Sequence, residues 1–114
     1  MRTYSVSLTE DAESDIAELM AFYDELVDEE SATKFFEEAM ATISKLQEFP
    51  HANSSLKEYP EAHRVRMENH KVAIVYIIDD YHYEVVAVRA YHQMQNPVEY
   101  QESIRERIRR LTDS

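Results

Sequence analysis

The side chains best suited to chemistry on an anionic substrate all lie in the second half of the chain. They are Arg64, Arg66, Arg89, Tyr91 and His92. Guanidinium groups can stabilise the charge that develops on phosphate oxygens when a ribose 2′-hydroxyl attacks the adjacent phosphodiester. A histidine titrates near neutrality and can move the proton, while a tyrosine can stack on a base or assist the transfer. If these residues share one face, they would suit metal-free cleavage of RNA.

A structural interpretation of the same residues stays open. Arg64, Arg66 and Arg89 would then form a solvated sheet face paired with nearby carboxylates, and His92 would make a hydrogen bond at the end of a strand. The other histidines show no i, i+4 pairing on a helix, and the chain has no cysteine, so we expect no metal site and no cofactor. Those histidines are His51, His63, His70 and His82.

Three strands are expected to position the candidate residues. We place them at about 62–68, 71–79 and 83–91, from alternation in the first and from β-branched and aromatic residues in the others. The turns contain Asn69-His70 and Asp79-Asp80, which tolerate left-handed conformations in a chain without glycine. Such short turns imply antiparallel neighbours.

The length of the second turn decides which side chains share a face. A three-residue turn at 80–82 would place Arg89 and Tyr91 on one exposed face with the two arginines of the preceding strand. An even-length turn would send Arg89 to the core side instead. We favour the three-residue turn because it avoids burying a guanidinium group without a partner.

One strand and a pair of helices are expected before this sheet. Residues 4–8 alternate between apolar and polar, as a half-buried strand does. Apolar residues then recur at helical spacing from Ala12 to Val27, after a capping Thr9, and again from Ala32 to Leu46. A C-terminal helix is expected over 97–112, with arginines in its last turns. The pattern predicts an α+β fold: a helical hairpin on a four-stranded, mainly antiparallel sheet, plus a C-terminal helix.

Composition indicates a single domain over residues 1–114 and a cytoplasmic protein. The N-terminus lacks a long apolar stretch, and the longest apolar run, 72–78, is far shorter than a membrane-spanning helix, so no membrane association is expected. The net charge of −11 argues against direct binding to duplex DNA. Residues 1–50 hold 13 acidic and 3 basic residues, a balance of −10, so an anion-binding surface must lie in the second half.

Several local motifs, in this order, resemble the RelE/ParE toxins of bacterial type II toxin–antitoxin systems. The similarity covers about residues 4 to 100. The motifs are Tyr4-Ser5-Val6-Ser7-Leu8-Thr9 with Ala12 and Asp15; Ala32, Phe35, Ile43, Leu46 and Phe49-Pro50; Arg64, Arg66, Val75-Tyr76 and Asp79; and Val88-Arg89-Ala90-Tyr91-His92 followed by Asn96-Pro97. This resemblance implies a RelE/ParE-like fold and a toxin that a cognate antitoxin protein, usually encoded beside it, holds silent.

The resemblance divides between two branches of the family. Glu68-Asn69-His70 and Arg89-Ala90-Tyr91-His92 are similar to the YoeB branch, whose members cleave messenger RNA on the ribosome. This implies a ribosome-dependent mRNA endonuclease in which His92 matches a family histidine. The long helical hairpin and the segment 92–97 are similar to ParE, whose members poison DNA gyrase without being nucleases. Both targets, the ribosome with its message and gyrase, therefore stay open.

One departure from the family concerns the residues after His92. Many relatives have arginines there, whereas this chain has Gln93-Met94-Gln95. Their absence weakens the nuclease and phosphate-binding interpretations. It also admits a third alternative, a degenerate, non-toxic member that only binds its antitoxin.

Overall fold

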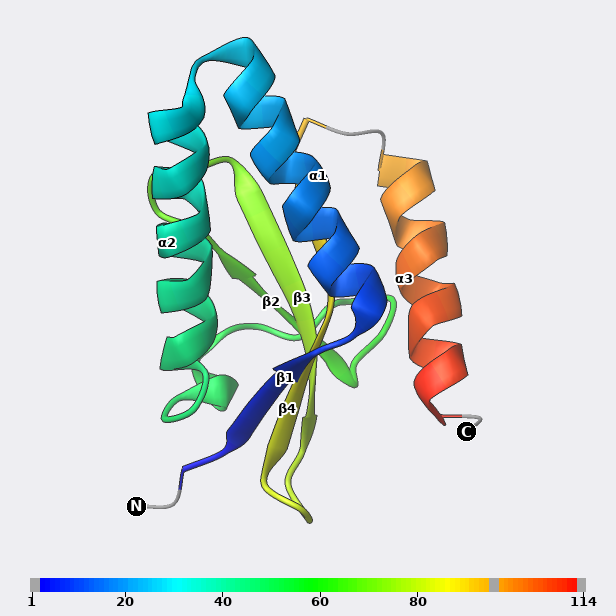
Figure 1. Ribbon diagram of the computed structural model, residues 1–114. Helices are drawn as coiled ribbons and strands as arrows, with labels where there is room; N and C mark the ends of the chain where they lie inside the picture. The colour runs from blue at the N-terminus through cyan, green and yellow to red at the C-terminus, as the bar shows by residue number, and fades with distance from the viewer. Residues whose placement is uncertain (1–2, 95–96, 113–114) are drawn as a thin grey trace.

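The predicted order of elements is confirmed by the computed structural model, which describes residues 3–94 and 97–112 (Figure 1). Gln95 and Asn96, which belong to motifs noted above, lie outside the described residues. The elements are β1 (Ser5–Leu8), α1 (Glu10–Leu26), α2 (Glu29–Lys45), a short 3-10 helix (Pro50–Ala52), β2 (Ala62–Arg66), β3 (Val72–Asp79), β4 (Glu84–His92) and α3 (Pro97–Thr112). The fold is therefore α+β, with a helical hairpin, a four-stranded sheet and a C-terminal helix.

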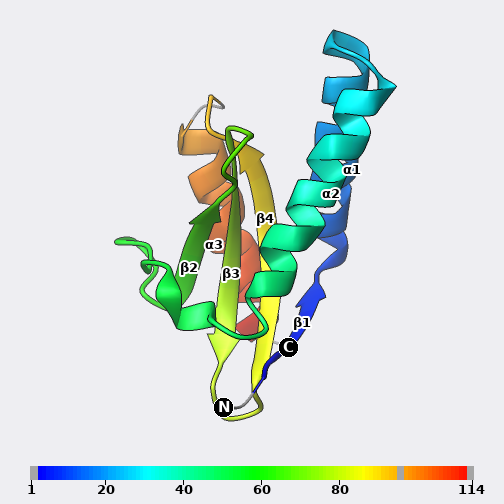
Figure 2. The same ribbon diagram turned by 90° about the vertical axis from the view of Figure 1, so that its left-hand side faces the viewer.

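Each helix of the hairpin, α1 and α2, begins with a side-chain cap. Thr9 Oγ1 accepts a hydrogen bond from Ala12 N at 3.1 Å, as predicted, and Asp28 Oδ1 accepts one from Ser31 N at 2.7 Å. These caps satisfy amide groups that have no partner within the helix. Figure 2 shows the hairpin on one side of the sheet, with its far end extending beyond the strands.

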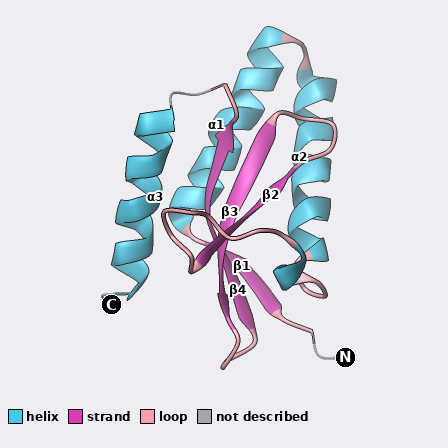
Figure 3. Ribbon diagram, turned by 180° about the vertical axis from the view of Figure 1, so that it is seen from behind, coloured by secondary structure: helices cyan, strands magenta, loops and turns pink. Residues whose placement is uncertain are grey.

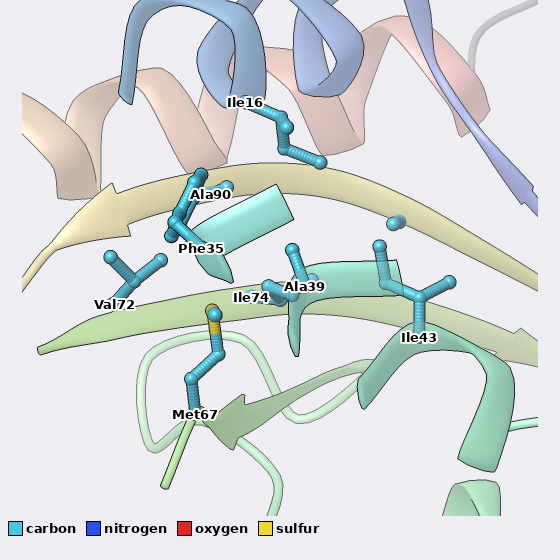
Figure 4. Packing of buried hydrophobic residues seen from close by; sticks show 9 residues of the cluster. Ile16, Phe35, Ala39, Ile43, Met67, Val72, Ile74 and Ala90 are labelled. Atoms are coloured by element: carbon cyan, nitrogen blue, oxygen red, sulfur yellow. The ribbon is translucent and has the colours of Figure 1, made fainter. Parts of the chain in front are cut away.

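The main core lies between this hairpin and the sheet (Figure 4). Ile16 of α1 and Phe35, Ala39 and Ile43 of α2 pack on Ile74 and its neighbours in β3 and β4. Phe35 is completely buried. Burying a phenylalanine side chain stabilises a fold by about 1.5–3 kcal/mol, so the apolar stripe of α2 helps to hold the hairpin to the sheet.

The sheet has the strand order β1-β4-β3-β2, with β1 parallel to β4 and the other two pairs antiparallel. Between β2 and β3 the expected antiparallel pairing is confirmed: Val65 lies opposite Ile74, and His63 lies opposite Tyr76. Alternate residues of β2 therefore point toward the hairpin and away from it.

The predicted length of the turn between β3 and β4 is wrong. Asp79 pairs with Glu84, so the connection is the four residues 80–83 and not three. The register then shifts at a β-bulge, where Val88 is the extra residue and Arg89 comes opposite Val75. The bulge makes the second half of β4 follow a different alternation from the first half.

Helix α3 covers the sheet face that points away from the hairpin. Ile104 and Ile108 pack on a buried cluster that includes Val75, Val88 and Tyr91. In Figure 3 the sheet stands in front of the hairpin and α3 lies beside the strands. None of the helices in the described part of the chain is long and apolar enough to cross a membrane.

Candidate functional site

Arg64 and Arg66 border a polar hollow at the β2 edge of the sheet. They stand opposite Val75 and Ala73, which belong to the cluster under α3, so both arginines point away from the hairpin. The hollow measures about 450 Å³, and the residues 53–56 form its other wall. Two guanidinium groups therefore share one concave surface with the side chains of a polar loop.

This loop covers the outer edge of β2. Arg64 N donates to Ser54 O at 3.2 Å, and Leu56 N donates to Ala62 O at 2.8 Å. The segment thus occupies backbone groups that an edge strand would otherwise expose. Its part in the hollow was not predictable from the sequence, because Asn53-Ser54-Ser55 indicated a loop but not that the loop returns along β2.

Tyr91 is not on an exposed face, contrary to the prediction. It lies opposite Ala73, on the same side as Arg64, but α3 covers it and leaves only 2% of its surface exposed. Its hydroxyl accepts a hydrogen bond from Arg64 Nη1 at 3.1 Å. In this structure Tyr91 therefore holds Arg64 through this hydrogen bond, and its buried ring cannot stack on a base.

Arg89 does not join the other two arginines. Arg89 Nη1 lies 2.7 Å from Asp15 Oδ1 of α1, and the two side chains are 13% and 6% exposed. Arg107 of α3 forms a second ion pair with the same carboxylate, in which Nη2 donates to Oδ1 at 3.2 Å. The prediction that Arg89 shares an exposed face with Arg64 and Arg66 is wrong. The prediction assumed that a buried Arg89 would have no partner, but Asp15 provides one.

Asp15 and Arg107 also close the free edge of β4. Pairing with β1 ends where Thr9 N donates to Ala87 O, and β4 continues for several residues beyond it. There Ala90 N donates to Asp15 Oδ2 at 3.0 Å, and Arg107 Nη1 donates to Val88 O at 2.8 Å. Side chains thus satisfy the backbone groups that β1 leaves unpaired. This arrangement gives the ion cluster a structural role.

His92 lies on the side of the sheet that faces the hairpin. It stands opposite Val72 of the main core, and its ring centroid is 5.9 Å from that of Phe22. Both rings line a largely apolar hollow of about 560 Å³, together with Met94. Met94 N donates to His92 Nδ1 at 3.1 Å. The histidine is therefore separated from the hollow of Arg64 by the sheet itself.

The five predicted residues thus do not form one site. Arg64, Arg66 and the covered Tyr91 lie on the α3 side of the sheet, and His92 faces the hairpin. Arg89 turns its guanidinium group away from Arg64, to Asp15 at the free edge of β4. Among residues 3–94 and 97–112, no group of three histidine, cysteine or carboxylate side chains could hold a metal ion. Of these five residues, only Arg64 and Arg66 line the same hollow, where both could contact a phosphate.

A further carboxylate, Glu38 of α2, fixes the turn that follows β2. It accepts hydrogen bonds from Asn69 N at 3.1 Å and Asn69 Nδ2 at 2.6 Å, and it contacts His70 Nδ1 at 3.1 Å. Partial burial by itself would raise the pKa of Glu38, but the hydrogen bonds from His70 and Asn69 outweigh it and hold the pKa below its ordinary value. Glu38 therefore stays charged and anchors the β2–β3 hairpin to α2.

No protein-family model and no curated protein matches the chain. Solved structures do match it. The chromosomal ParDE toxin–antitoxin system from P. aeruginosa is 18% identical, with a TM-score of 0.69, over 79% of this chain and 96% of that one. A mutant of the E. coli toxin RelE in the free state is 17% identical, with a TM-score of 0.64, over 91% and 97%.

A third match is the toxin–antitoxin complex RelBE2 from Mycobacterium tuberculosis. It is 21% identical, with a TM-score of 0.60, over 83% of this chain and 97% of that one. These likenesses span nearly the whole of each matched chain. The chain therefore has the RelE/ParE fold, as its sequence motifs led us to expect.

Proposed function

We propose that the protein is the toxin of a type II toxin–antitoxin pair and that a cognate antitoxin holds it silent in the cytoplasm. The RelE/ParE fold supports this proposal, since the matched structures cover 79% and 91% of this chain, and so do the sequence motifs over about residues 4 to 100. Among the alternatives from the sequence, the geometry favours a ParE-like toxin that binds a protein target, DNA gyrase, over a nuclease.

The observation that carries this choice is the position of Arg89. RNA cleavage without a metal needs several cationic groups and a proton carrier around one phosphate. Here Arg89 is committed to Asp15, and His92 faces the hairpin. Tyr91 is buried under α3. The chemistry expected from these residues would therefore require α3 and β4 to rearrange.

A ribosome-dependent mRNA endonuclease remains the second candidate, and the polar hollow favours it. Arg64 and Arg66 line it together with Asn53, Ser54 and Ser55, which supply hydrogen-bond groups suited to a phosphodiester. Arg64 is also held by Tyr91 at 3.1 Å. Two arginines without a nearby proton carrier can bind RNA more readily than they can cleave it.

Expression of the chain in a bacterial host separates these proposals. We expect growth arrest that co-expression of the adjacent reading frame relieves, with trapped gyrase–DNA complexes and intact messages. The Arg66→Ala variant should still arrest growth, because the protein-binding proposal does not use the polar hollow.

Cuts within translated codons that disappear in Arg66→Ala would overturn the gyrase proposal and establish the nuclease. Normal growth at confirmed soluble expression would contradict both and leave a degenerate member that only binds its antitoxin. Arg64→Lys is a matched variant for the hollow, since it keeps the charge but loses the planar guanidinium.

A further inference from the structure

A cluster of aromatic side chains surrounds a hollow near the N-terminal end of the chain, away from both arginine clusters. The hollow measures about 460 Å³ and is lined by the residue before β1, by residues 48–52 after α2 and by the β3–β4 loop. These segments lie at the lower end of Figure 1. We call it the aromatic hollow. Its lining consists of Tyr4, Glu48, Phe49, Pro50, His51, Ala52 and Tyr83.

The rings of the aromatic hollow are held in fixed positions. The centroids of Tyr4 and Tyr83 are 5.4 Å apart, and those of Tyr4 and His51 are 6.3 Å apart in an edge-on arrangement. Asp80 joins two of these rings, because Tyr4 donates its hydroxyl proton to Asp80 Oδ1 at 2.7 Å and His51 Nε2 contacts the same atom at 2.8 Å. A binding surface of this kind loses little conformational entropy when it is occupied.

Tyr83 reaches its place through an unfavourable backbone conformation. Its φ of 54° is in the left-handed region, where it is the only non-glycine residue among those described. Such a conformation is costly for a bulky side chain. Ser5 N donates to Tyr83 O at 2.9 Å and so holds this backbone against β1. The loop thus keeps an aromatic ring in the hollow at a conformational cost.

The electrostatics of the hollow favour a cation. The faces of aromatic rings are electronegative, and Glu48 adds a carboxylate to the lining, which includes neither lysine nor arginine. The hydrogen bonds from Tyr4 and His51 lower the pKa of Asp80, so this second carboxylate is ionised at neutral pH. The acidic balance of the first fifty residues adds to the same field.

We propose that the aromatic hollow binds the arginine side chain of a partner protein. A planar guanidinium group can stack on the face of Tyr4 or Tyr83 while it pairs with the carboxylate of Glu48. An exposed Phe49 can pack against the aliphatic part of the same side chain. This interaction surface is separate from the polar hollow of Arg64 and does not depend on the toxin's mode of action.

The test uses N-acetyl-arginine-methylamide as the probe and NMR shifts of the aromatic side chains as the readout. We expect saturable shifts of the Tyr4 and Tyr83 rings, with a weak affinity typical of a single side chain. Tyr83→Asn should weaken binding about threefold or more, because asparagine tolerates the left-handed conformation but removes the ring. Glu48→Gln should also weaken it and should reduce its dependence on salt.

Tyr81→Asn is the matched control, since Tyr81 is in the same loop but is 86% exposed and does not line the hollow. Binding should be unchanged in this variant. The proposal fails if the norleucine analogue of the probe binds equally well, which would indicate apolar adhesion only. It also fails if the probe causes no saturable shift up to about 50 mM, an affinity too weak for a recognition site. A spectrum of the folded protein without probe confirms that each variant remains intact.

Discussion

Two pairs of arginines in this molecule have the same chemistry but different surroundings. Arg89 and Arg107 share the carboxylate of Asp15 and are 13% and 15% exposed. Arg64 and Arg66 lie two strands away on β2 and border a polar hollow, where Arg66 is exposed. The first pair has its charge neutralised by a neighbour, whereas the second still presents its charge to a ligand.

The difference shows that an arginine motif does not by itself identify an anion site. Arg89 belongs to the segment that most resembles the family, yet its guanidinium holds α1 against β4. Burial makes such a charge costly unless a partner neutralises it, so the position of one aspartate decides the role of the arginine. Three expected outcomes sharpen this comparison.

The largest effect is expected from removing the shared carboxylate. Asp15→Ala would leave Arg89 as a buried charge without this partner and would leave Arg107 with the longer contact to Asp11 at 3.8 Å. It would also leave Ala90 N without its acceptor. Loss of one member of a buried ion pair typically costs about 3–5 kcal/mol. We expect the free energy of unfolding to fall by about this amount in urea denaturation.

Asp11→Ala is the matched control for this prediction. Asp11 also pairs with α3, at 2.8 Å from Arg110 Nη2, but its side chain is 44% exposed. A solvated pair of this kind contributes less than about 1 kcal/mol. Equal losses in the two variants would contradict the distinction between a buried and a solvated ion pair.

A smaller effect is expected on the side of the polar hollow. Tyr91→Phe removes the acceptor that Arg64 Nη1 contacts at 3.1 Å and should cost about 1 kcal/mol. Arg66→Ala should change stability by less than about 0.5 kcal/mol, because its side chain is exposed. Thermal unfolding of both variants measures the difference. A larger loss for Arg66→Ala would mean that this arginine, too, is structural.

The smallest effect concerns the pH dependence of the contact between Glu38 and the turn after β2. Because the folded-state pKa of Glu38 is lowered, its contribution to stability is complete above the ordinary glutamate pKa of about 4.3 and is lost as the pH falls through the folded-state value. Glu38→Gln should therefore flatten the acid side of the stability curve without changing its slope near neutrality. If the stability of Glu38→Gln fell at acid pH as steeply as that of the original protein, the hydrogen bonds to Asn69 and His70 would not depend on the charge of Glu38.

Local patterns determined most of the fold. The apolar stripes of both helices, the cap at Thr9 and the strand β2 can each be recognised from the spacing of residues close in sequence, and the structure confirms these elements. The register of β2 against β3 was predictable for the same reason, since a short turn joins the two strands. The sequence also contained Asp15, a carboxylate within the apolar stripe of α1 and part of the family motif, although nothing in the pattern showed what it would contact.

The tertiary structure alone decided which of the candidate residues can act together. The loop 80–83 is one residue longer than predicted, and β4 has a bulge at Val88. Together they set the direction of every later side chain in β4, and neither has a signature in the sequence. The partner of Arg89 comes from a helix more than seventy positions away, and the cover on Tyr91 comes from α3. A sequence therefore determines residue types and local spacing, whereas the neutralisation of a charge depends on long-range contacts that form only when helices and sheet pack together.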